Sequence, residues 1–256
     1  MRHTSFRPAR VRSSFRTIAL VAMFVTLPLA AASAPQTAPP TKAETDRTSI
    51  LLKLPAVNAA GFIGDPYPLD TCIVSGEKLG AESVTVILKD MPDALQEGRQ
   101  IKLCCKACEA KLLANPTEYL RKLDAAIIAQ QGASYPLTHC LVMLDETLVE
   151  DDHKTVVFGN RLYKLCCKKC VNNFLKGTGR YVGAFDREWT AKQKSKYPLD
   201  TCVVTGEKLG DKPVDLMIGY ELVRVATNDA AKTVLENPKP YLAKLAAAKT
   251  AASKTN

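Results

Sequence analysis

Cysteine is the residue type that could do chemistry in this chain, because its thiolate binds soft metal ions, forms disulfides and carries redox reactions. The sequence contains nine cysteines. Eight of them fall into two groups of the same make-up: one isolated cysteine, followed later in the chain by a Cys-Cys-x-x-Cys cluster. We predict all eight as metal ligands: Cys72, Cys104, Cys105 and Cys108 in the first group, and Cys140, Cys166, Cys167 and Cys170 in the second.

The spacing of each cluster suits a metal site at the start of a helix. Residues three or four positions apart lie on one face of a helix, as Cys104 and Cys108 would. The free N–H groups and positive dipole end of a helix N-terminus lower the pKa of a thiol. Four thiolates suit Zn(II), whereas two or three thiolates with a thioether suit Cu(I). We therefore predict about one Zn(II) or Cu(I) ion per group, and the sequence leaves the choice open.

The two groups belong to an internal repeat with three copies. The segment Tyr-Pro-Leu-Asp-Thr-Cys at 67–72 recurs as Tyr-Pro-Leu-Thr-His-Cys at 135–140 and unchanged at 197–202. The third copy has lost the cluster, because Ala226, Thr227 and Ala230 stand where the first has Cys104, Cys105 and Cys108. We predict metal-binding module 1 at 66–131, metal-binding module 2 at 132–193, a degenerate module 3 at 194–248 that binds no metal, and a tail at 249–256.

The position three residues after the isolated cysteine differs between the copies. A zinc knuckle has its second cysteine there, but this chain has Ser75, Met143 and Thr205. The turn thus supplies one thiolate, with a thioether as a possible second sulfur in module 2 only.

Each module reads as an α+β unit. In module 1 the sequence predicts short strands at 83–88 and 100–103, because Val, Ile, Thr and Leu predominate there. A helix should begin at Cys105 with Cys108, Leu112 and Leu113 on one face. A second helix should follow Asn115-Pro116, because asparagine suits an N-cap and proline the first helical position.

The chain resembles the YHS/TRASH-type treble-clef metal-binding domain family. The single cysteine at the turn, the later Cys-x-x-x-Cys at 104–108 and 166–170, and the run LLANPTEYL at 112–120 carry this resemblance. It implies three tandem treble-clef-like modules and a role in zinc or copper sensing, trafficking or resistance. Its ligands would be Cys72, Cys104 and Cys108, then Cys140, Cys166 and Cys170. Cys105 and Cys167 stand where the family often has another small residue.

Two other uses of the cysteines remain open. Structural disulfides are common in oxidising compartments, although the vicinal pairs in each cluster cannot easily bridge each other. A thiol–disulfide enzyme would use the Cys-x-x-Cys at 105–108 and 167–170, but no thioredoxin-like βαβ pattern surrounds either. A structural-zinc interaction module is a further alternative. We predict a protein that is not an enzyme and whose partners are a metal ion and a periplasmic protein.

The N-terminal region reads as an export signal. A basic segment precedes an apolar run from Thr17 to Leu29, with small residues after it, which predicts a signal peptide at 1–32 and a periplasmic or secreted protein with no stable membrane span after cleavage. Residues 33–65 are rich in Ala, Pro and Thr and predict a flexible tether. Removal of the five arginines before residue 17 lowers the formal charge from +9 to +4, which argues against nucleic-acid binding.

Overall fold

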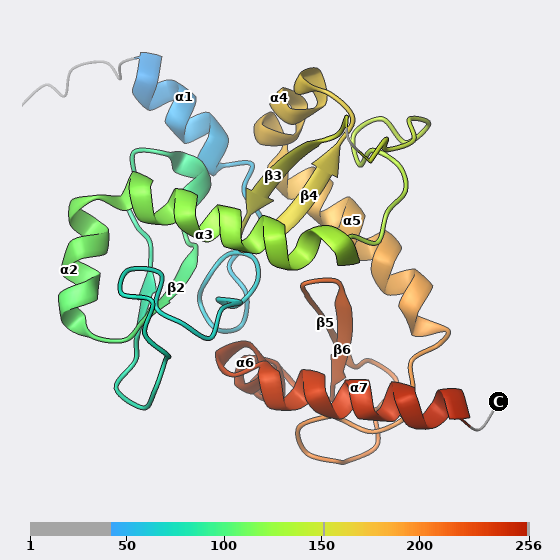
Figure 1. Cartoon of the computed structure of the whole chain (residues 1–256). Coiled ribbons are helices and arrows are strands. Elements are labelled where there is room, and N and C mark those ends of the chain that lie inside the picture. The colour runs from blue at the N-terminus through green and yellow to red at the C-terminus, as the bar shows by residue number, and fades with distance from the viewer. Residues whose placement is uncertain (1–41, 151, 255–256) are drawn as a thin grey trace, which may run out of the picture. The chain divides into compact units, whose positions relative to one another are not determined.

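The fold is α+β, as predicted, and is built from three separate two-stranded antiparallel hairpins, each followed by two helices (Figure 1). The structure, a computed structural model, describes residues 42–150 and 152–254. The predicted signal peptide and the first part of the predicted tether lie outside the described residues. None of the described helices combines the length and the hydrophobicity that a bilayer crossing requires.

The elements repeat in the same order in each module. In module 1 they are β1 (Val84–Ile87), β2 (Gln100–Leu103), α2 (Lys106–Ala114) and α3 (Pro116–Gln131). In module 2 they are β3 (Lys154–Phe158), β4 (Arg161–Leu165), α4 (Lys168–Lys176) and α5 (Thr178–Lys194). In module 3 they are β5 (Val214–Ile218), β6 (Glu221–Val225), α6 (Asn228–Glu236) and α7 (Lys239–Lys254). Helix α1 (Lys42–Leu51) precedes them, and short 3-10 turns lie at Ala94–Gln96 and Gly132–Ser134.

Each hairpin packs its helices over a small apolar core of its own. In module 1 that core includes Ile101 and Leu103 from β2, Leu112 from α2 and Leu123 from α3, all buried. Leu113 does not share this face as predicted, because it is 54% exposed. The helix turns buried Cys108 and Leu112 inward together, four positions apart, and the next position points outward.

The described part of the predicted tether, residues 42–65, is not a flexible segment. It forms helix α1 and then a turn in which Phe62 and Ile63 are buried. The backbone there is also paired, because the N–H of Ile63 donates to Gly98 O and the N–H of Asp65 donates to Gly159 O. The prediction of a tether is therefore wrong for these residues, since buried apolar side chains and backbone hydrogen bonds dock the segment.

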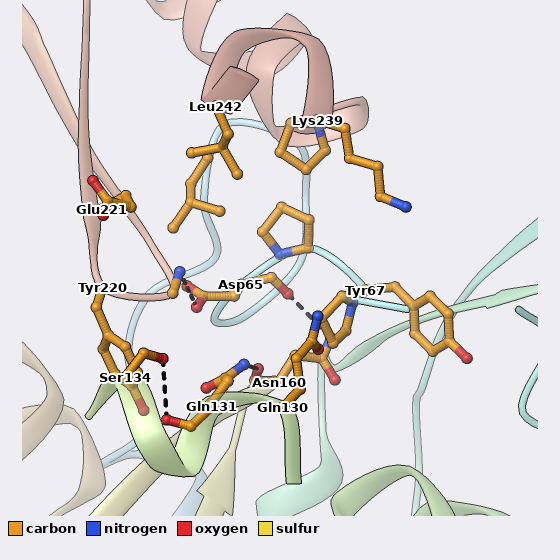
Figure 2. A pocket seen from close by; sticks show the side chains of 15 residues that line it. Asp65, Tyr67, Gln130, Gln131, Ser134, Asn160, Tyr220, Glu221, Lys239 and Leu242 are labelled. Carbon is orange, nitrogen blue, oxygen red and sulfur yellow. Dashed lines mark hydrogen bonds between the residues drawn. The ribbon is translucent and has the colours of Figure 1, made fainter. Parts of the chain in front are cut away.

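Asp65 lies at a buried junction where the hairpin ends of modules 2 and 3 meet this N-terminal segment. Its carboxylate accepts hydrogen bonds from the Arg161 guanidinium (2.9 Å from Nε) and from the backbone N–H of Gly219 (2.7 Å). Asn160 of module 2 connects module 1 to the same place, because its side chain donates to the backbone carbonyls of Asp65 and of Gln100 in module 1. Figure 2 shows Asp65 and Asn160 at the wall of a cavity of about 320 Å³ that all three modules line. We call these contacts the Asp65 junction.

A repeated glutamine contact also joins successive modules. Gln131, at the end of α3, donates to Asn160 O and accepts from the Leu162 N–H of the next hairpin. Gln193, near the end of α5, makes the same pair of bonds with Tyr220 O and the Leu222 N–H. The last helix of one module thus pairs with the turn of the next, which fixes the spacing of the repeat.

Candidate metal centre

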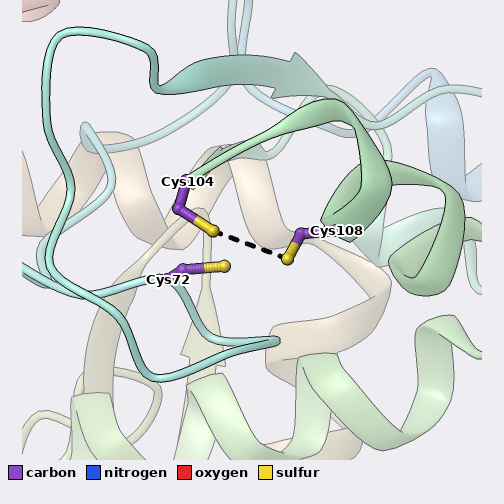
Figure 3. Close-up of side chains that lie close together, drawn as sticks. All are labelled: Cys72, Cys104 and Cys108. Atoms are coloured by element: carbon purple, nitrogen blue, oxygen red, sulfur yellow. Dashed lines mark hydrogen bonds between the residues drawn. The ribbon is translucent and has the colours of Figure 1, made fainter.

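Three elements of module 1 bring three cysteines together. Cys72 lies in the turn after the Tyr-Pro-Leu segment, Cys104 directly follows β2, and Cys108 lies in the first turn of α2. Their sulfur atoms all lie within 4.8 Å of one another, and those of Cys104 and Cys108 are 3.5 Å apart (Figure 3). Cys72 and Cys108 are buried, while Cys104 is half-buried. We call this group triad 1.

Module 2 builds the same group from matching positions. Cys140, Cys166 and Cys170 have sulfur atoms within 4.8 Å of one another, with 3.5 Å between those of Cys166 and Cys170. The burial pattern is also the same, since only Cys166 is half-buried. We call this group triad 2.

The sulfur separations suit a shared metal ion. Thiolate sulfurs that each lie about 2.3 Å from one ion stand about 3.8 to 4.0 Å from one another in tetrahedral or trigonal geometry. Every sulfur separation within a triad is at most 4.8 Å and one pair in each triad is 3.5 Å apart, so small shifts would bring the sulfurs to these values. The donors are soft sulfur atoms at a strand-to-helix junction. All nine cysteines are free thiols in the structure. Triads 1 and 2 could therefore each hold a metal ion.

The isolated cysteine of each module receives backbone hydrogen bonds that favour its thiolate. Burial raises the pKa of Cys72, but N–H groups of Cys104, Ser75 and Val74 outweigh it and lower the pKa to about 7. At Cys140 and Cys202, too, burial raises the pKa but hydrogen bonds from backbone N–H groups outweigh it, so the pKa of each thiol is lowered. The three turns thus stabilise a thiolate in the same way, through backbone N–H hydrogen bonds to its sulfur.

The other sulfurs of each triad favour the protonated form without a metal. The Ser75 hydroxyl lowers the pKa of Cys104, but desolvation and the neighbouring sulfurs together raise it to about 12. Burial raises the pKa of Cys166 to about 11, with added contributions from Cys140 and Cys167. Burial also raises the pKa values of Cys108 and Cys170. In each triad the isolated cysteine is therefore the thiol that ionises most readily, and the other two are protonated at neutral pH.

Metal binding should consequently release protons and strengthen as the pH rises. Near pH 8 the ion must displace about two protons per triad, because two thiols of each triad have raised pKa values and ligands must be deprotonated. In triad 1 a third proton, from Cys72, joins them below pH 7. We expect the logarithm of the Zn(II) affinity to rise by about two per pH unit near pH 8, measured by competition with a chromophoric chelator. A slope below one would contradict this ligand set.

Cys105 and Cys167 lie beside the triads rather than within them. Each occupies the N-cap position of its helix, α2 or α4. The Cys105 sulfur is 3.8 Å from that of Cys104, but it is not among the sulfurs that all lie within 4.8 Å of one another. Backbone N–H groups at the helix start lower the pKa of both thiols. The structure thus brings together six of the eight predicted ligands, and the role of the other two stays a prediction.

Module 3 closes the same strand-to-helix junction without the cysteine cluster. Thr227 occupies the N-cap of α6 and its hydroxyl accepts from the Ala230 N–H at 3.2 Å. At the matching positions of modules 1 and 2, the sulfurs of Cys105 and Cys167 replace this hydroxyl beside the backbone N–H groups of Cys108 and Cys170. Ala230 and Ala231 are buried against the hairpin. The sequence showed the loss of the cluster, and its Thr227 could have signalled the cap that replaces it.

Comparison with known proteins does not extend this assignment. No family model, no curated protein and no solved structure matches the chain. The assignment of a metal site therefore rests on the geometry of the chain itself. That geometry is two cysteine triads in repeated positions, each able to hold a metal ion.

Proposed function

We propose that this chain is an exported protein that sequesters or transfers a soft metal ion, Zn(II) or Cu(I), with one ion in each of modules 1 and 2. The observation that carries the proposal is the recurrence of one sulfur triad at the same place in two modules. The resemblance to YHS/TRASH-type treble-clef modules supports it, as does the export signal expected in residues 1–32. A periplasmic protein would be the donor or acceptor of the ion.

Module 3 favours a transported ion over a purely structural one. It keeps the hairpin and both helices although Ala226 and Ala230 replace two of the three sulfur positions. The scaffold therefore closes without a metal, whereas small zinc domains commonly unfold without theirs. Each triad also offers three sulfurs and a half-buried edge at Cys104 or Cys166, which leaves room for the donor atom of an exchange partner.

A thiol–disulfide protein is the second candidate. Cys105 is exposed, lies at a helix start and has a lowered pKa, which are features of an attacking thiol. Cys104 and Cys108 lie beside it, so any disulfide formed there would destroy triad 1. A module therefore cannot bind metal through its triad while these cysteines form a disulfide. Reduction of a test disulfide that is lost in Cys105→Ser would favour the redox function.

The deciding experiment measures the metal content and free thiols of the chain without residues 1–32, purified without oxygen. We expect about two ions per chain, because two triads are present. The double variant Cys104→Ser/Cys166→Ser should lose both ions, whereas Cys202→Ser should keep both. A chain without metal, whose cysteines no longer react with a thiol reagent, would overturn the proposal in favour of disulfides.

A further inference from the structure

The residue three positions after the isolated cysteine faces the triad. In module 1 this residue is Ser75, whose hydroxyl lies 3.3 Å from the Cys104 sulfur and also bonds the Cys72 sulfur. The side chain at this position therefore starts beside the metal site, where a fourth ligand would be needed.

Met143 holds the same position in module 2. The N–H of Ser75 donates to the Cys72 sulfur, and the N–H of Met143 donates to the Cys140 sulfur in the same way. The two backbones thus present their side chains from the same place relative to the triads. A methionine side chain is longer than that of serine and carries a thioether sulfur near its end, which is a soft donor.

The turn of module 2 is rebuilt in a way that releases the Met143 side chain. In module 1 the Ser75 hydroxyl accepts from the Glu77 N–H, so it is part of the turn. In module 2 the corresponding turn bond runs from the Glu146 N–H to the backbone carbonyl of Met143, at 3.0 Å. The turn is also one residue longer, since the Cys140 N–H pairs with Glu146 O whereas the Cys72 N–H pairs with Glu77 O.

Packing does not account for Met143 and Leu144 in this turn. Met143 is 45% exposed and the following Leu144 is 63% exposed, whereas module 1 has Ser75 and Gly76 there. Methionine has several freely rotating bonds, so an exposed Met143 can swing to a nearby site. The backbone N–H of Met143 already bonds the Cys140 sulfur, so its exposed thioether starts within reach of triad 2.

We propose that Met143 is the fourth sulfur donor of module 2, so that triad 2 with Met143 forms a centre that prefers Cu(I). Module 1 has only a hydroxyl at this position and lacks that preference. The two sites of the protein are therefore different in kind. This inference rests on the proposed function, since it requires that the triads bind metal.

The test uses the full chain with triad 1 removed by Cys104→Ser/Cys108→Ser, so that only module 2 reports. Cu(I) affinity is measured by competition with bathocuproine disulfonate, and the number of sulfur ligands by X-ray absorption. Residues outside the first ligand shell already change metal affinity about tenfold to a hundredfold, so loss of a direct donor should cost at least about tenfold. Met143→Leu should weaken Cu(I) binding by that factor, remove one sulfur and leave Zn(II) affinity nearly unchanged.

Two further variants make the result specific. Leu144→Ser removes the neighbouring exposed apolar residue of the same turn and should leave Cu(I) binding unchanged. Ser75→Met, in a chain with triad 2 removed, should strengthen Cu(I) binding in module 1. Unchanged Cu(I) affinity and sulfur count in Met143→Leu would overturn this inference while the proposed function stands. A parent chain that binds neither Cu(I) nor Zn(II) would overturn both.

Discussion

Replacing Cys72 with serine should weaken metal binding in module 1 by on the order of a hundredfold. Binding free energies of structural zinc sites are about 10 to 16 kcal/mol for four ligands, or about 3 kcal/mol per ligand. That amount corresponds to a factor of on the order of a hundred in Kd. Loss of the Cys72 sulfur should reduce the binding free energy by at least this amount, because its turn lowers the pKa of the thiol to about 7 and so favours the thiolate. Chelator competition on a chain that lacks triad 2 would measure the change.

Cys202→Ser is the matched control for this prediction. Cys202 is buried like Cys72, and its sulfur accepts N–H bonds from the corresponding residues Val204, Thr205 and Ala226. Serine should therefore disturb both turns to a similar degree, but only the Cys72 variant removes a sulfur from a triad. Equal losses of metal from the two variants would show that the effect comes from misfolding rather than from ligation.

The local elements of each module could be predicted from the sequence because local signals determine them. The predicted strand at 100–103 coincides with β2, and Asn115-Pro116 separates α2 from α3 as expected. The cysteine triads followed from the same reasoning, since each isolated cysteine recurs with its cluster. Only two sulfurs per cluster join the isolated cysteine, because Cys105 and Cys167 take the helix N-cap and their sulfurs are not within 4.8 Å of all the others.

Contacts between modules could not be predicted, because they join residues far apart that carry no local signal. Asp65 lies in a segment of weak pattern, yet it pairs with Arg161 and with the Gly219 N–H. The paired glutamines, Gln131 and Gln193, look like ordinary surface residues at the ends of helices. They differ from other surface residues only in occupying corresponding positions in two copies of the repeat. That correspondence gains meaning only when the structure shows which hairpin turns they contact.

The Asp65 junction should make a large contribution to stability. Arg161 is only 4% exposed, and its guanidinium bonds the carboxylates of Asp65 and Asp186 and the Met217 carbonyl. Burial alone would lower the pKa of Arg161, but these carboxylates hold it well above its ordinary value. Arg161→Ala would leave the Asp65 carboxyl buried with the Gly219 N–H as its remaining donor among the described residues, and burial already raises its pKa. The carboxyl must then stay charged at a large cost or take up a proton. Removing one partner of a buried ion pair typically costs about 3 to 5 kcal/mol.

We therefore expect Arg161→Ala to lower the free energy of unfolding by about 3 to 5 kcal/mol in urea titrations of the metal-free chain. Module 3 offers the matched control, because Glu221 aligns with Arg161 in the repeat and pairs with Lys249 of the last helix. That pair is largely exposed, so Lys249→Ala should change the free energy by less than about 1 kcal/mol. Similar losses in both variants would mean that the junction adds no more than a surface ion pair. A large loss confined to Arg161→Ala would show that the junction stabilises the fold far more than a surface ion pair does. Both metal sites are built on strands that begin at or next to this junction.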